Sequence, residues 1–183
     1  MKKNKTSKNW IKKQHRDQYV RKSKIFGYRS RSAYKLIEMD QKFKFLDRRK
    51  TLIDLGSSPG GWSQVAAKKI NKGKVLAVDI KDMEKINNVE FLKGDFLKVE
   101  VHEKILNYFD KKVDIVISDM AADTSGNKDL DSFKTGELCL AAMELAYKIL
   151  NKEGVFISKL FMGSIFAEID KKANEIFKKV VKY

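Results

Sequence analysis

Short runs of aliphatic and β-branched residues alternate with longer segments in which apolar positions recur every third or fourth residue. The short runs predict buried strands, and the longer segments predict helices with one buried face. The predicted strands are 51–55, 75–79, 89–92, 113–119, 155–159 and a last one within 178–183. The predicted helices are 30–45, 62–70, 101–108, 131–150 and 167–177. This alternation predicts an α/β fold in which helices cover both faces of a mostly parallel sheet.

The composition fits one compact domain preceded by a basic arm. A hydrophobic fraction of 43% with a single proline in 183 residues favours a globular chain with a real core. We expect residues 1–28 to form the arm, with one helical stretch, and residues 29–183 to form the domain. No apolar run approaches the roughly 20 residues of a membrane helix, so we expect no membrane association. We also expect a monomer.

The few cysteine and histidine residues argue against a metal site. Cys139 lies in an apolar helical stretch and is expected to be buried, which fits a reducing compartment such as the cytoplasm. His15 and His102 are far from each other and from any cysteine cluster, so we expect no zinc site. A basic amino terminus with few acids is also typical of transit peptides, which keeps an organellar matrix open as an alternative location.

The positive charge is concentrated in the first 50 residues. They contribute +14 of the formal net charge of +15, with 18 lysines and arginines against 4 acidic residues. All the arginines lie in this part: Arg16, Arg21, Arg29, Arg31, Arg48 and Arg49. The aromatic residues interleaved with them are Trp10, Tyr19, Phe26, Tyr28 and Tyr34. Guanidinium groups pair with phosphates and stack on bases, so we predict RNA binding here. A solubilising tail would explain the lysines of residues 2–13 but not the arginines.

The first predicted strand leads into a glycine-rich turn with the sequence Asp-Leu-Gly-Ser-Ser-Pro-Gly-Gly-Trp-Ser-Gln, residues 54–64. Such a turn is the nucleotide-binding corner of doubly wound α/β folds. Its glycines do not follow G-x-G-x-x-G, and Trp62 stands where a P-loop has its lysine. A turn without a cation suits a ligand without phosphate, and an acid such as Asp54 suits the sulfonium of S-adenosylmethionine. The alternative is a plain strand-to-helix turn whose glycines allow tight packing.

Charged residues also follow four later strands, at the edge of the sheet where α/β proteins bind ligands. Asp79 is placed to accept from ribose hydroxyls, and Asp95 can accept from an adenine amino group. Each acid alone would more simply cap a helix or close a turn. Lys159 lies between two apolar segments and needs a partner, for which Asp119 on the neighbouring strand is expected. Such a pair can remove a proton from a hydroxyl, although it can also be a structural ion pair.

Several motifs, in their order and spacing, resemble the FtsJ family of ribosomal RNA 2′-O-methyltransferases. They are the glycine-rich turn, Gly94-Asp95-Phe96, Ser118-Asp119-Met120-Ala121, Ser158-Lys159 and the earlier Arg29-Ser30-Arg31-Ser32-Ala33-Tyr34-Lys35-Leu36. The resemblance covers the chain from about residue 10 to residue 183. It implies a Rossmann-like methyltransferase fold, S-adenosylmethionine as cofactor, and a uridine ribose of large-subunit ribosomal RNA as the usual target.

The turn and the resemblance together define the candidate site. The candidate cofactor-binding residues are Gly56, Ser58, Pro59, Gly60, Gly61, Trp62, Asp79, Asp95 and Asp119. Lys35, Asp119 and Lys159 match three members of the family's Lys-Asp-Lys-Glu catalytic tetrad. The tetrad glutamate belongs to the family's last strand, which the sequence does not reach before Tyr183. The family's usual Pro-Asn after the Asp-Met-Ala segment is replaced by Ala122-Asp123.

The resulting hypothesis is methyl transfer to a ribose, with Lys159 as the base, Asp119 orienting it and Lys35 positioning the target nucleotide. No metal is needed for this chemistry. Two alternatives remain open. One keeps the chemistry and moves it to tRNA or to an mRNA cap. The other is a non-catalytic RNA-binding or ribosome-assembly module on the same fold, which the unmatched fourth acid would explain.

Overall fold

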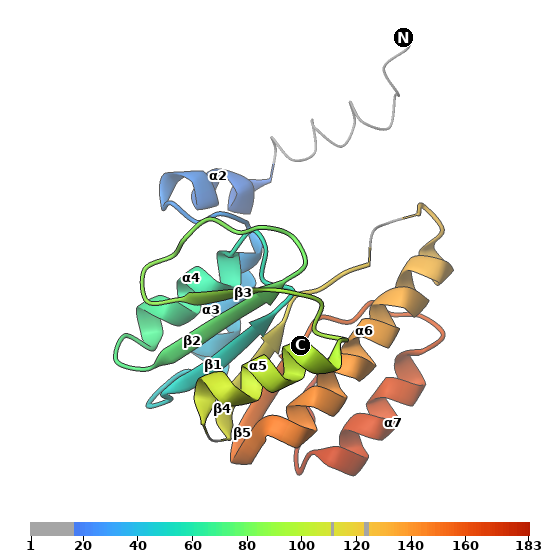
Figure 1. The fold of residues 1–183 in the computed structure, drawn as a ribbon. Helices are drawn as coiled ribbons and strands as arrows, with labels where there is room; N and C mark the ends of the chain where they lie inside the picture. Colours follow the sequence, from blue (N-terminus) through green and yellow to red (C-terminus); the bar gives the residue numbers. More distant parts are fainter. Residues whose placement is uncertain (1–16, 111, 123–124) are drawn as a thin grey trace.

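The computed structural model describes residues 17–110, 112–122 and 125–183, and within them five parallel strands form one sheet (Figure 1). The order across the sheet is β3-β2-β1-β4-β5. The strands are β1 (Thr51–Leu55), β2 (Lys74–Asp79), β3 (Glu90–Lys93), β4 (Val113–Ser118) and β5 (Leu150–Ser158). The helices are α2 (Gln18–Ile25), α3 (Ser32–Phe43), α4 (Gly61–Lys69), α5 (Val99–Phe109), α6 (Lys128–Ile149) and α7 (Phe166–Ile176). The predicted α/β fold is confirmed.

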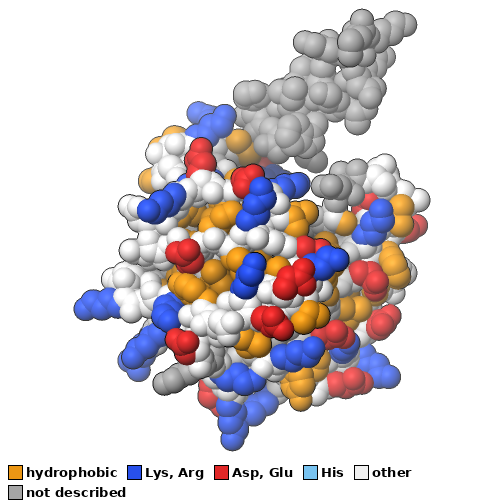
Figure 2. Space-filling model, viewed as in Figure 1, with side chains coloured by type: hydrophobic (Ala, Val, Ile, Leu, Met, Phe, Trp, Pro, Cys, Tyr) orange, Lys and Arg blue, Asp and Glu red, His pale blue; other side chains and the backbone are white. Residues whose placement is uncertain are grey.

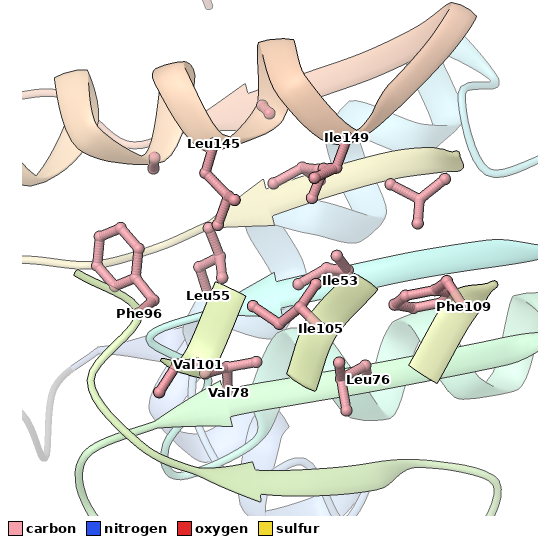
Figure 3. Close-up of a cluster of buried hydrophobic side chains, with 14 residues drawn as sticks. Ile53, Leu55, Leu76, Val78, Phe96, Val101, Ile105, Phe109, Leu145 and Ile149 are labelled. Carbon is pink, nitrogen blue, oxygen red and sulfur yellow. The ribbon is translucent and has the colours of Figure 1, made fainter. Parts of the chain in front are cut away.

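Helices cover both faces of this sheet. On one face α5 and α6 pack against the strands through a cluster that includes Ile53, Ile105 and Ile149 (Figure 3). On the opposite face α3 and α4 pack through a second cluster, which includes Leu36 and Val65. All five side chains are at most 3% exposed. Burying one such side chain stabilises the fold by about 1.5–3 kcal/mol, so the two clusters hold the strand ends in fixed positions.

The helical stretch predicted within the basic arm is α2. The Asp17 side chain caps it by accepting from the backbone N–H groups of Tyr19 and Val20. The Tyr19 ring lies against that of Tyr34 on α3, with 5.5 Å between centroids, and the Tyr19 hydroxyl donates to Glu38 at 2.9 Å. The rest of the arm, residues 1–16 with Trp10 and His15, lies outside the described residues.

The last predicted strand, within 178–183, is wrong. After α7, residues 177–183 have no regular structure. Phe177 stacks on Phe156 of β5 with 5.9 Å between ring centroids, and Val180 packs beside the α6–α7 cluster. Of the apolar pair that suggested a strand, Val180 is partly buried by this side-chain packing, and Val181 is exposed. Tyr183 ends near Phe43 of α3, with 5.8 Å between centroids.

Two further sequence expectations concern α6 and the membrane. Cys139 on α6 is buried, as predicted. None of the helices in the described residues is long and apolar enough to cross a bilayer.

Candidate active site

The glycine-rich turn follows β1 and runs into α4. Gly56 has a φ of +71°, a conformation that favours glycine, and a Cβ there would lie 2.0 Å from Cγ of Met120. A Cβ on Gly61 would lie 2.0 Å from Oγ of Ser30. The glycines thus allow two other segments to approach the turn closely, namely the loop after β4 and the residues before α3.

The turn forms one wall of a cavity of about 540 Å³ at the carboxyl ends of β1, β4 and β5. This volume is in the usual range for a small-molecule site. The lining residues come from α2, from α3 and the residues before it, from the turn, and from the ends of β4 and β5. They are Tyr19, Ser30, Arg31, Ser32, Tyr34, Lys35, Glu38, Asp54, Gly56, Ser57, Ser58, Pro59, Gly61, Trp62, Asp119 and Lys159.

The structure brings most of the predicted site residues together at this cavity. Those that line it are Lys35, Gly56, Ser58, Pro59, Gly61, Trp62, Asp119 and Lys159. Gly60, Asp79 and Asp95 do not line it. Asp79 lies behind the turn, where its carboxylate accepts from the backbone N–H groups of Ser58 at 2.8 Å and Lys81 at 2.7 Å. Asp95 accepts from Leu97 N–H at 3.0 Å and so closes a turn.

Asp119 and Lys159 form the ion pair that the sequence predicted. β4 and β5 pair with Ser118 opposite Ser158, so the next residue of each strand meets its counterpart. Nζ of Lys159 lies 3.2 Å from Oδ1 of Asp119 and donates to its backbone carbonyl at 2.8 Å. The side chains are 23% and 20% exposed, and both line the cavity. The pair is fixed by the sheet yet reachable by a ligand.

Asp54 is a buried carboxyl group at the end of β1. It is 1% exposed, and the Ser63 hydroxyl donates to it at 2.6 Å. Burial raises the pKa of Asp54 to about 7; the Ser63 hydrogen bond opposes this shift, and the carboxylates of Asp119 and Asp79 add to it. An acid that ionises near neutral pH beside the cavity suits a cationic ligand.

A second buried polar group lines the same wall. Ser57 is 5% exposed, and its Oγ has no hydrogen-bond partner among the described residues. An unpaired buried hydroxyl is costly, so Ser57 Oγ is available to a polar atom of a ligand. Together with Asp54 and the close backbone of the turn, Ser57 fits the polar parts of S-adenosylmethionine. Within the described residues, no group of three or more histidine, cysteine, aspartate or glutamate side chains is placed to hold a metal ion.

One face of α3 and its N-cap lines the cavity opposite the turn. Its residues are Arg31, Tyr34, Lys35 and Glu38, with the spacing of a single helical face. Of these, Lys35 was predicted to be catalytic, Arg31 and Tyr34 were named only within the predicted RNA-binding region and the motif of residues 29–36, and Glu38 was not predicted. The periodic signal was present, but a polar helical face is also what ordinary solvent exposure produces. Among the described residues Lys35 makes no ion pair, so its exposed ammonium group is available at the cavity.

Comparison with known families identifies the family of the chain that carries this site. Residues 28–183 match the FtsJ-like methyltransferase family. The chain belongs to the FtsJ-like methyltransferase family. It is therefore a methyltransferase, and the resemblance that its motifs indicated is confirmed.

Individual members of the FtsJ-like family cover nearly the whole chain. Ribosomal RNA large subunit methyltransferase E of Pelagibacter ubique is 52% identical over 98% of this chain and 89% of its own length. The protein of the same name from Rickettsia akari is 43% identical over 96% of this chain and 80% of its own length. A solved structure, a ribosomal RNA methyltransferase from Plasmodium falciparum, superposes with a TM-score of 0.77 at 35% identity, covering 84% of this chain and 90% of that one.

Proposed function

We propose that this chain transfers a methyl group from S-adenosylmethionine to the 2′-oxygen of a uridine ribose in large-subunit ribosomal RNA. The observation that carries the proposal is the Asp119–Lys159 pair, which shares one cavity with the glycine-rich turn. The names of the relatives support ribosomal RNA as the substrate.

The donor occupies the side of the cavity formed by the turn. When bound, S-adenosylmethionine supplies a methyl group activated by a sulfonium sulfur. Asp54 provides negative charge for that cation, and Ser57 Oγ provides a free polar group. Asp79 and Asp95, which lie outside the cavity lining, are kept as candidates for the adenosine end of the ligand.

Lys159 is the base in this proposal. Once its ammonium group has released a proton to solvent, Nζ accepts the proton of the 2′-hydroxyl as the oxygen gains the methyl group. Asp119 holds Nζ in place through its carboxylate and its backbone carbonyl. Lys35 approaches from α3 and positions the target nucleotide. The rest of the rate gain comes from alignment of donor and acceptor in one cavity.

The proposal also covers the role of the arm, the oligomeric state and the location of the enzyme. Residues 1–28 act as an RNA-binding arm on a methyltransferase domain of residues 29–183. We expect the enzyme to act as a monomer in the bacterial cytoplasm, where ribosomal RNA is made.

The test is a methyl-transfer assay with labelled S-adenosylmethionine and large ribosomal subunits from a strain that lacks the gene. Ribose-methylation mapping should then show one new 2′-O-methyluridine in the large-subunit RNA. Transfer to tRNA or to capped RNA instead would move the proposal to those acceptors. RNA binding without S-adenosylmethionine binding by calorimetry would leave only the non-catalytic module.

A further inference from the structure

The side chain of Arg29 binds three backbone carbonyl groups from two separate loops. Nη1 donates to Pro59 O at 3.2 Å and to Glu84 O at 2.7 Å, and Nη2 donates to Lys85 O at 2.9 Å. Pro59 belongs to the glycine-rich turn, and Glu84 and Lys85 belong to the β2–β3 loop, which arches below α2 in Figure 1. The Glu84 carboxylate is 3.7 Å away and 91% exposed, whereas the Arg29 side chain is only 20% exposed. The three carbonyls are therefore the main partners of the guanidinium.

The backbone of the same segment is tied to α4. The N–H of Arg29 donates to Oε1 of Gln64 at 2.8 Å, and Nε2 of Gln64 donates to Gly27 O at 3.0 Å. A Cβ on Gly60 would lie 3.1 Å from Nη1 of Arg29, which shows how closely the turn and this side chain pack. Arg29 is thus joined to the turn, to the helix that follows it, and to the loop after Asp79.

Arg29 connects two parts of the site. We call residues 54–62 and the β2–β3 loop (80–89) the donor side. We call the cavity-lining residues of α2 and of α3 with its N-cap the acceptor side; they are Tyr19, Arg31, Tyr34, Lys35 and Glu38. Arg29 lies in the connection between α2 and α3, so it belongs in sequence to the acceptor side while its side chain is bound by the donor side.

We propose that Arg29 is a positioning residue that couples methyl-donor binding to RNA binding. The inference rests on the proposed function. A donor molecule in the turn fixes the carbonyls that hold the guanidinium, and through it the segment between α2 and α3. RNA bound on the acceptor side fixes the segment between α2 and α3, and through Arg29 it fixes the same carbonyl contacts. Each ligand thereby reduces the ordering cost of the other, and the coupling is reciprocal. Lysine has no planar fork to reach three carbonyls at once.

The experiment measures the affinity of the full chain for large-subunit ribosomal RNA with and without saturating S-adenosylhomocysteine, the unreactive product. We expect the product to tighten RNA binding of the wild type at least about fivefold. Arg29→Lys and Arg29→Gln should reduce this ratio to about one. Arg21→Gln is the matched control, because it removes the same charge from an exposed position on α2. It should keep the wild-type ratio even where RNA binding weakens overall.

A wild-type ratio of one, or a wild-type ratio retained by Arg29→Lys, would overturn the inference. If the wild type binds no S-adenosylhomocysteine at all, the proposed function fails instead, so the two failures are distinguishable. Should both Arg29 variants unfold, Gln64→Met breaks the neighbouring link to the same segment. That variant must also lower the ratio, and an unchanged ratio counts against the coupling.

Discussion

The donor side and the acceptor side of the cavity are built on different principles. On the donor side the backbone bonds to itself and to a half-buried acid: Gly60 N–H donates to Ser57 O at 2.7 Å, and Ser58 N–H donates to Asp79 at 2.8 Å. On the acceptor side Lys35 is exposed and Tyr19 is 43% exposed. The backbone of the turn is held by these hydrogen bonds, whereas the acceptor side offers side chains at an open surface.

This difference matches the two ligands. A small ligand is best met by a turn whose backbone is already hydrogen-bonded, because less of the turn then has to be ordered on binding. A folded RNA needs cations and aromatic rings over a wider surface. Figure 2 shows basic and acidic side chains interspersed over the drawn face, which agrees with a net charge of +1 for residues 51–183. The excess of positive charge lies in the first 50 residues, which carry the acceptor side. Variants should therefore separate into those that change donor affinity and those that change RNA affinity.

The largest effect is expected at Lys159, where the two sides meet. Lys159→Ala removes the proposed base and should reduce single-turnover methyl transfer by about 10²–10⁴-fold. Donor affinity should change little, because the turn does not depend on the lysine. Single-turnover rates and calorimetry with S-adenosylmethionine measure the two quantities separately.

Lys152→Ala is the matched control for that variant. Lys152 is an exposed lysine on β5, the strand that Lys159 directly follows, so its removal changes the charge but not the site. Methyl transfer that survives in Lys159→Ala would remove the base assignment and leave Asp119–Lys159 as a structural ion pair. That outcome would also mean that donor and acceptor do not react at this pair.

Removal of residues 1–16 tests the RNA-binding arm and leaves the acceptor side in place. This segment contributes seven lysines and arginines and no acid. Its deletion should weaken RNA binding and flatten its salt dependence, by about 0.7–0.9 in the log–log slope for each phosphate that the arm neutralises. The cut leaves α2 and its packing against α3 intact, so donor affinity should stay the same. Filter binding across a series of salt concentrations measures the slope, and an unchanged slope would show that the arm does not bind phosphate.

The donor side was largely predictable from sequence, and the acceptor side was not. β1 at Thr51–Leu55 and the turn after it were predicted from strong local sequence signals. The Asp119–Lys159 pair was predictable because the carboxyl ends of parallel strands lie at one edge of a sheet. Tyr34 was expected only within the RNA-binding region and the motif of residues 29–36, and Glu38 had no signal, since their part in the cavity depends on how α3 packs across α4. Arg29 was visible only as one of several arginines and as the first residue of the motif at 29–36.

The predicted strand boundaries were wrong where tertiary packing sets the end of a strand. β5 begins at Leu150 instead of residue 155, and its register with β4 shifts between Val113 and Ile115. Asn151 in that irregular stretch donates to Asp114 at 2.6 Å, a contact that the local sequence pattern does not predict. The pattern of apolar residues locates the core of an element better than its ends.

A smaller effect is expected where the two sides touch, at Gly61. Gly61→Ala places a methyl group 2.0 Å from Oγ of Ser30, and such overpacking typically costs about 1–3 kcal/mol of unfolding free energy. Ser30→Ala removes that oxygen, and the next atom, Cβ of Ser30, lies at 3.2 Å. The double variant should therefore recover most of the loss. Urea unfolding of the two single variants and the double variant gives the coupling energy. Additive losses would mean that the contact with Ser30 is not what requires glycine.

The last effect is a pH dependence, and it concerns the carboxyl group of Asp54 on the donor side. Because its folded-state pKa is raised from 3.8 to about 7, the folded chain keeps a proton that the unfolded chain releases between these values. The stability contributed by this group is therefore present below about pH 4 and is lost as the pH rises to about 7. Asp54→Asn has no charge to bury. As the pH rises across this window, the unfolding free energy of the variant should therefore increase relative to that of the wild type. Urea titrations between pH 4.5 and 8 compare the two, and parallel curves would show that Asp54 ionises at its ordinary pKa.

The same carboxyl group distinguishes the donor from its product. S-adenosylmethionine carries a sulfonium cation and the product does not, so only the donor gains when Asp54 ionises. Wild-type affinity for S-adenosylmethionine, relative to S-adenosylhomocysteine, should rise as the pH passes through 7, and the Asp54→Asn variant should lack this rise. Calorimetry with both ligands at pH 6 and pH 8 measures it. If the ratio of affinities does not depend on pH in the wild type, the burial of Asp54 stabilises the turn only through Ser63, and the preorganisation of the donor side is steric and not electrostatic.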